Sequence, residues 1–216
     1  MEYAGQQSMR GFLQQKRDGK MEEHEIKPIF RQIVKAVSYC HQHDIAHRDI
    51  KLENILIINK KTVKLIDFGF SINLKHKGRL NLFCGTPSYM PPEIVSKVSY
   101  YGKPADIWAL GILLYKMLAG YFPFKGRNDR DLFRKIKQGN LAFPKNISDG
   151  LKHLLKSLLK VTPSERITAK EVNWFEFAIF ERFLDINGSI KSRRNGLYSS
   201  RYLDYYDVLL CLLRKN

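Results

Sequence analysis

Two short polar segments that flank a predicted β-hairpin constrain the fold of this chain most strongly. The runs Ile55–Ile58 and Val63–Ile66 are rich in β-branched residues and enclose a polar turn, which is the pattern of a two-stranded hairpin. The segment His47–Asn54 precedes the first strand, and Asp67–Gly69 follows the second. Because the open ends of two antiparallel strands lie side by side, we expect these polar segments to meet.

The remainder of the sequence has mainly helical patterning. Apolar residues recur at helical spacing from Glu22 to Gln42, and Pro104–Ala119 is apolar on nearly every side and ends before Gly120. Three further helices are expected over residues 128–138, 148–160 and 168–175, with Ser148 as an N-cap and Thr168 with Glu171 as a capping box. These features predict a mainly α fold with a short β-hairpin.

Length and composition indicate one globular domain followed by a tail. The chain has 216 residues, of which 44% are hydrophobic. We expect the domain over residues 1–184 and a tail over 185–216, consisting of a polar linker and an amphipathic segment from Tyr202 to Leu213. The formal net charge is +16, but the basic residues are dispersed and carry no nucleic-acid signature, so no nucleic-acid partner is expected.

Cysteine content and hydropathy indicate the compartment. The three cysteines form no disulfide framework, which fits a reducing environment. The longest apolar stretch, 107–124, is interrupted by Lys116 and two glycines, so we expect a buried helix and no membrane span. The first residues lack the layout of a signal peptide. We therefore expect a cytoplasmic or nuclear protein.

The polar segments carry a family resemblance. The order His47–Asn54, then Asp67–Gly69, then Pro91–Glu93 resembles the catalytic segments of eukaryotic-type protein kinases, and Lys51 is typical of the serine/threonine branch. The amino-acid sequences of Phe83–Pro87 and of the predicted helix before His47 are similar to those of the AMP-activated and microtubule-affinity-regulating kinases. The resemblance implies a serine/threonine protein kinase that uses ATP and Mg²⁺ and acts on hydroxyl groups of a protein substrate.

The resemblance also implies which part of such a domain is present. It places a hinge at residues 1–5, a catalytic loop at 47–54 and an activation segment at 67–93. No Gly-x-Gly-x-x-Gly loop or strand lysine precedes them. We therefore expect the C-terminal lobe of the kinase-like α+β fold, with the N-terminal lobe absent.

Specific roles follow for individual residues. The resemblance implies Asp49 as the catalytic base, Lys51 as a phosphate contact, and Asn54 and Asp67 as metal ligands. It implies that Glu2, Ala4 and Leu56 contact the nucleotide together with Lys51, Asn54 and Asp67, and that Glu53 and Thr86 contact the substrate. It implies structural support from His47, Arg48, Glu93, Asp106 and Arg166, with Glu93 and Arg166 as a buried ion pair.

Three alternatives and departures bear on function. The group Cys40, His41, His43 and His47 suggests zinc, but no second Cys/His pair follows at ligand spacing. Leu82 stands where related kinases carry a phosphorylatable threonine, so activation by phosphorylation there is not expected. The rival function is a catalytically inactive interaction module, with a possible partner at an exposed hinge face.

Overall fold

The computed structural model describes residues 7–59, 62–145 and 147–172, and all of these lie in one compact unit. The expected hinge at 1–5, the tail at 185–216 and the end of the last expected helix lie outside the described residues.

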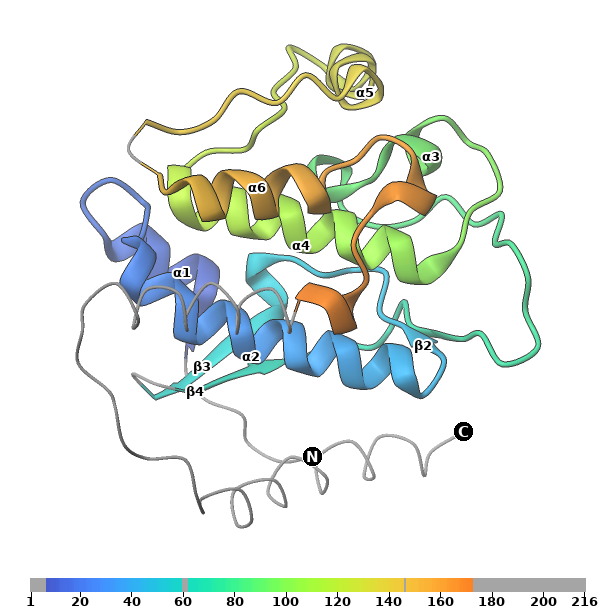
Figure 1. Cartoon of the computed structure of the whole chain (residues 1–216), viewed down its shortest axis with the longest axis horizontal. Coiled ribbons are helices and arrows are strands. Elements are labelled where there is room, and N and C mark those ends of the chain that lie inside the picture. Colours follow the sequence, from blue (N-terminus) through green and yellow to red (C-terminus); the bar gives the residue numbers. More distant parts are fainter. Residues whose placement is uncertain (1–6, 60–61, 146, 173–216) are drawn as a thin grey trace. The chain divides into compact units, whose positions relative to one another are not determined.

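Three long helices form the core (Figure 1). Helix α2 (Glu23–Gln42) and helix α6 (Asp149–Leu158) both pack against α4 (Gly102–Ala119). Helix α4 is buried on all sides, and Trp108, Leu110 and Met117 are fully inaccessible to solvent. Because α4 has no solvent-facing side, nearly all of its residues are apolar, as we expected for a buried helix.

Glycines set the end of α4 and its closest approach to another segment. Gly120 ends the helix in the left-handed conformation at φ 77°, where a Cβ would lie 2.6 Å from the Asp18 carbonyl oxygen. Within the helix, a Cβ on Gly111 would lie 2.8 Å from the side chain of Leu159. The lack of a side chain at these two glycines allows neighbouring segments to pack closely against α4.

The expected hairpin is present and has a third, short strand. Strand β3 (Ile55–Asn59) pairs antiparallel with β4 (Thr62–Leu65), with Ile55 opposite Leu65. Strand β1 (Gln7–Ser8), which the sequence did not predict, pairs with the other edge of β3 and leads into α1 (Met9–Gln15). A second sheet joins β2 (Ile45–Ala46) to β5 (Ile72–Asn73).

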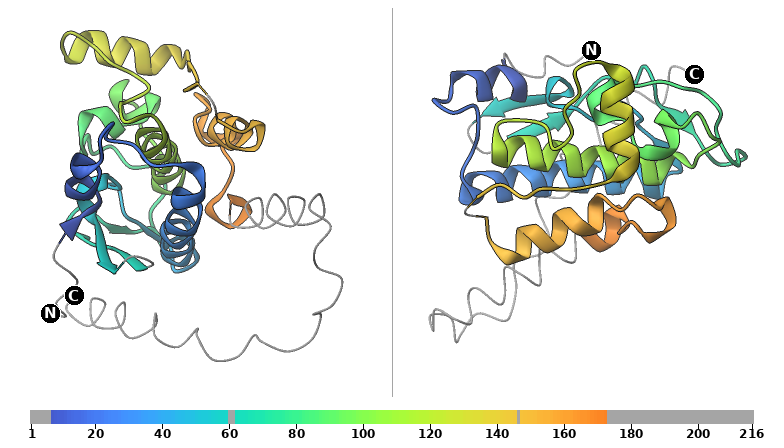
Figure 2. Two further views of the ribbon diagram at one scale, coloured as in Figure 1. Left: turned by 90° about the vertical axis from the view of Figure 1, so that its left-hand side faces the viewer. Right: turned by 90° about the horizontal axis from the view of Figure 1, so that it is seen from above.

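Two further helices lie on the opposite side of α4 from α2 (Figure 1). Helix α3 (Pro92–Val95) packs against α5 (Asp129–Gln138), and α5 crosses over α4 when the molecule is viewed from above (Figure 2). Short 3₁₀ turns occur at Leu52–Asn54, Pro87–Tyr89 and Pro163–Glu165. Asn128 and Ser148 cap α5 and α6 through their side chains, and the Thr168–Glu171 capping box is formed.

Candidate active site

The loop from His47 to Asn54 is held in place by Asp106 on α4. The backbone N–H groups of His47 and Arg48 donate to the two carboxylate oxygens of Asp106, at 2.9 and 2.8 Å. Arg48 has a positive φ of 65°, a conformation that non-glycine residues rarely adopt. Because Asp106 is almost fully buried, its charge makes these two hydrogen bonds strong, and they stabilise the unusual backbone.

His41 is a further partner of Asp106 that sequence reasoning missed. Its Nε2 lies 2.8 Å from Asp106 Oδ2. His41 is the second-last residue of α2, and its ring reaches across to Asp106 on α4. We therefore interpret His41 as a support of the Asp106 carboxylate.

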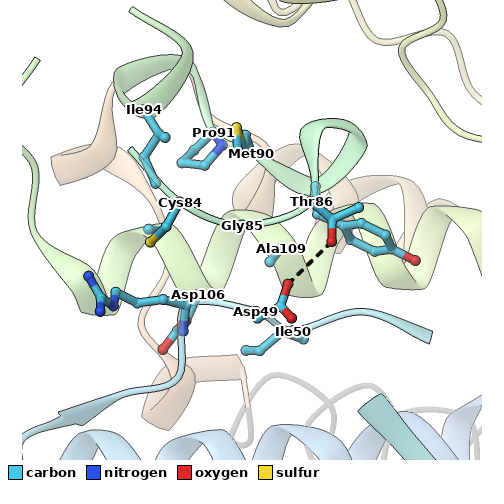
Figure 3. Close-up of a pocket in the computed structure, with 13 residues that line it drawn as sticks. Asp49, Ile50, Cys84, Gly85, Thr86, Met90, Pro91, Ile94, Asp106 and Ala109 are labelled. Atoms are coloured by element: carbon cyan, nitrogen blue, oxygen red, sulfur yellow. Dashed lines mark hydrogen bonds between the residues drawn. The ribbon is translucent and has the colours of Figure 1, made fainter. Parts of the chain in front are cut away.

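Asp49 is the centre of a compact polar cluster. Its side chain is buried, and Oδ2 accepts hydrogen bonds from Lys51 Nζ at 2.6 Å and from Asn54 Nδ2 at 3.1 Å. The Thr86 hydroxyl donates to Oδ1 at 3.3 Å (Figure 3). Lys51 Nζ also donates to the Thr86 oxygen, at 3.3 Å. Thr86 therefore lies beside Asp49 and Lys51.

Asn54 is oriented by two donor contacts. Its Nδ2 donates to the Asp49 carbonyl oxygen at 2.9 Å, in addition to the carboxylate. Since both contacts use the amide nitrogen, the amide oxygen remains available as a ligand within the described part of the chain. This orientation fits the role of a hard oxygen donor for a cation such as Mg²⁺.

Asp67 reaches the same region through the hairpin. The Ile66 N–H donates to the Asn54 carbonyl oxygen at 2.9 Å, so the residue before Asp67 is tied directly to Asn54. His47 Nε2 lies 3.0 Å from the Ile66 carbonyl oxygen. Asp67 itself has a φ of 63° and an exposed carboxylate whose Oδ1 accepts from the Gly69 N–H. The two polar segments therefore meet as predicted.

The donor set suits magnesium held jointly with a phosphate better than a metal held by protein alone. Among the described residues, no three His, Cys, Asp or Glu side chains are grouped so that they could hold a metal ion. Mg²⁺ is commonly bound through one or two protein oxygens, with phosphate and water completing its coordination. One amide and one carboxylate, Asn54 and Asp67, fit this pattern.

The residues considered as zinc ligands make other contacts in the structure. Cys40 is buried, and burial raises the pKa of its thiol to about 12, assisted by the negative charge of Asp106. His43 packs on the ring of Tyr39 at 4.2 Å between centroids, and His47 packs on Phe68 at 4.7 Å. A thiol that resists ionisation is a poor zinc ligand.

A small cavity lies between the catalytic loop and the activation segment. It has a volume of about 20 Å³ and is lined by residues that include Asp49, Cys84, Thr86 and Ala109 (Figure 3). A space of this size holds about one water molecule. It separates the polar cluster from α4 and offers no room for a nucleotide.

Glu93 and Arg166 form the expected buried ion pair. Arg166 Nη1 and Nη2 donate to the two Glu93 oxygens, each at 2.7 Å, and the side chains are 1% and 7% exposed. The remaining Arg166 donors reach the carbonyl oxygens of Lys160, Pro104 and Val161. The pair therefore joins α3, at the end of the activation segment, to the segment after α6.

Glu53 has a partner that no sequence pattern indicated. Arg10 on α1 donates to its Oε1 at 2.9 Å, whereas Oε2 is buried without a hydrogen bond among the described residues. Leu56 is half-buried in β3, beside Ser8 of β1. The other expected nucleotide contacts, Glu2 and Ala4, lie outside the described residues.

Comparisons with known proteins identify the family. Residues 1–177 match the protein kinase domain family. The chain is 42% identical over 180 residues to the carbon catabolite-derepressing protein kinase of Candida albicans, covering 82% of this chain and 28% of the relative. It is 41% identical over 164 residues to CBL-interacting protein kinase 1 of Oryza sativa subsp. japonica, covering 73% and 36%.

A third relative extends the same pattern. The CBL-interacting serine/threonine-protein kinase 15 of Arabidopsis thaliana is 37% identical over 169 residues, covering 76% of this chain and 40% of the relative. The fold and site define a protein of the kinase class. The chain belongs to the protein kinase domain family, and it spans well under half of the length of these relatives.

The family generally uses ATP and Mg²⁺. None of the helices in the described ranges has both the length and the apolar character needed to cross a membrane.

Proposed function

We propose that this chain carries the catalytic and substrate-facing part of a serine/threonine protein kinase and corresponds to the C-terminal lobe of the domain. The observation that carries the proposal is the convergence of Asp49, Lys51 and Asn54 in one hydrogen-bonded cluster, with Asp67 joined to Asn54 through Ile66. Binding alone does not call for a buried carboxylate, a lysine and two magnesium-type ligands at one place.

Each member has a role in this proposal. Asp49 presents a carboxylate that orients a substrate hydroxyl and accepts its proton. Lys51, held 2.6 Å from Asp49, provides positive charge beside the transferred group. When bound, MgATP supplies the phosphoryl group, and Asn54 and Asp67 are the residues that would hold the ion. Thr86 connects the activation segment to Asp49 and so couples the position of this segment to the base.

The proposal also includes an expectation about the isolated chain. The 216 residues contain no Gly-x-Gly-x-x-Gly segment to cover the phosphates. Positioning and electrostatic stabilisation supply most of phosphoryl-transfer catalysis, so we expect the 216-residue chain by itself to transfer little phosphate. Transfer to a generic serine-containing protein that Asp49→Asn abolishes would contradict this expectation and support the enzyme directly.

A test of the site itself measures nucleotide binding. We expect fluorescent ATP to bind this chain more tightly with Mg²⁺ than with EDTA, and Asp67→Asn to remove the difference. Asp129→Asn, an exposed change on α5, is the matched control and should leave it intact. If Mg²⁺ has no effect on binding by the unaltered chain, the proposed ligand pair is wrong.

The second candidate is an inactive interaction module. Leu82, which is 55% exposed and cannot be phosphorylated, favours it. A longer protein containing this chain that neither binds MgATP nor transfers phosphate would support the module over the enzyme.

A further inference from the structure

The outer side of α5 is a strongly basic surface that the proposed catalytic site does not use. Leu132 and Ile136 anchor the helix to the domain. Arg130, Arg134 and Lys137 are spaced by four and three residues, which places them on one side of the helix, and all three are exposed. Together with Arg127, Asn128 and Asp131, they line an open hollow of about 590 Å³.

The single carboxylate in this hollow is already engaged. Asp131 accepts from Arg134 Nη2 at 2.7 Å and from the Arg127 N–H at 3.2 Å, and it lies 3.3 Å from Lys135 Nζ. The hydrogen bond from Arg134, followed by that from the Arg127 backbone, lowers the pKa of Asp131 to about 2. Its charge is therefore balanced within α5.

Three cations of the hollow have no such balance. Across the residues that the structure describes, no carboxylate lies within ion-pair distance of the side chains of Arg127, Arg130 or Lys137. The hollow thus combines a net positive charge with donors that point to solvent. Guanidinium groups in this setting pair well with carboxylates, because their donors match the geometry of the two oxygens.

We propose that this hollow is a docking site for an acidic polypeptide segment. From Arg130 to Lys137 the helix rises by about 10 Å, which equals the span of about three residues of an extended chain. Acidic residues at alternate positions of an extended segment project from one side every ~6.6 Å, close to the ~6 Å rise between Arg130 and Arg134. The charge and the spacing of the hollow are therefore complementary to such a segment.

The lining favours polypeptide over nucleic acid and lipid. None of the six lining residues is aromatic or aliphatic. Binding to single-stranded nucleic acid normally uses aromatic side chains for base stacking, and interfacial membrane binding buries apolar side chains. In addition, Phe133 of α5 packs on Phe83 of the activation segment, with ring centroids 6.3 Å apart. A polypeptide bound on α5 would therefore lie next to the segment that is proposed to receive the substrate.

The test is a binding measurement on the whole 216-residue chain, without ATP. The probe is a fluorescein-labelled peptide of about 12 residues in which Glu and Ala alternate, and anisotropy is recorded at about 50 mM salt. The double variant Arg130→Glu with Lys137→Glu should weaken binding about tenfold or more, since two attractive contacts become repulsive. A peptide with Gln in place of Glu should not bind.

The control separates a local site from the net charge of +16. Arg31→Glu with Lys160→Glu makes the same change in charge at two exposed residues outside the hollow, and we expect its affinity to stay within about twofold. Circular dichroism verifies that both double variants are folded. Equal losses in the two variants would overturn the proposal, because the attraction would then be unspecific.

Other outcomes also overturn it. These are a lack of binding to the Glu-Ala peptide, or tighter binding of a DNA duplex of about 20 base pairs or of phosphatidylserine vesicles through Arg130 and Lys137. The result is independent of phosphoryl transfer, since neither nucleotide nor catalysis enters the measurement. Failure here would leave the proposed kinase function untouched, and failure of the MgATP test would leave this site untouched.

Discussion

Replacement of Arg166 by alanine is the most direct test of how the activation segment is fixed to the domain. The Arg166 guanidinium makes two hydrogen bonds of 2.7 Å to Glu93 and three more to backbone carbonyl oxygens. It also lies over the Trp108 ring, with Cζ 5.1 Å from the centroid. Arg166→Ala removes all of these contacts and leaves the Glu93 carboxylate buried without a cation.

The expected magnitude follows from burial. Removal of one partner from a buried ion pair typically costs about 3–5 kcal/mol, because the other charge remains desolvated. For a domain of about this size, each kcal/mol corresponds to roughly 2–4 °C in Tm. We therefore expect Arg166→Ala to lower the free energy of unfolding by about 3–5 kcal/mol and Tm by about 6–20 °C.

Urea unfolding followed by circular dichroism measures this loss. The double variant Glu93→Leu with Arg166→Met removes both charges, and it should be more stable than Arg166→Ala because no buried charge is left alone. Arg31→Ala, at an exposed position on α2, should change stability by less than about 0.5 kcal/mol. A loss below about 1 kcal/mol for Arg166→Ala, or a double variant no more stable than the single one, would refute the reasoning.

Four further predictions concern other parts of the domain. Asp106→Ala removes the acceptor of two catalytic-loop amides, so hydrogen exchange at these amides should accelerate and stability should fall by about 2–4 kcal/mol; unchanged exchange would contradict this. Gly120→Ala should destabilise by at least about 1 kcal/mol in thermal unfolding because of its positive φ and the close carbonyl oxygen, whereas Gly78→Ala, with no atom within 4 Å of the added Cβ, should not. In site-resolved alkylation at pH 8, Cys84 should react well before the buried Cys40. In the folded protein the pKa of Cys40 is about 12, above the ordinary value of 9.0. The stability that comes from keeping this thiol protonated is therefore complete below pH 9 and is lost as the pH rises from there toward 12. Urea unfolding at several pH values measures this loss.

The features that sequence predicted well are those fixed by neighbouring residues. Helix α4 could be located because its apolar run ends at a glycine, and α6 because Ser148 caps its first turn. The hairpin followed from its two β-branched runs, and the meeting of the two polar segments followed from the hairpin. In each case the determining interactions lie within a few residues of one another.

The features that sequence missed depend on contacts between distant residues. Arg10 and Glu53 are 43 positions apart, and neither carries a signal that names the other. Strands of two residues, such as β2 and β5, are too short to show an alternating pattern.

The activation segment shows how the departure at Leu82 is compatible with an ordered site. Leu80 and Tyr100 exchange two backbone hydrogen bonds, of 2.7 and 2.9 Å, and the Tyr100 hydroxyl donates to the Leu82 carbonyl oxygen at 3.1 Å. Arg48 Nε donates to the Phe70 carbonyl oxygen at 2.7 Å. Burial raises the pKa of Tyr100, and the Arg48 side chain beside it acts in the opposite direction. Backbone and tyrosine contacts thus hold both ends of the segment around Leu82, so the order of this region does not require the phosphate that a threonine at Leu82 would carry.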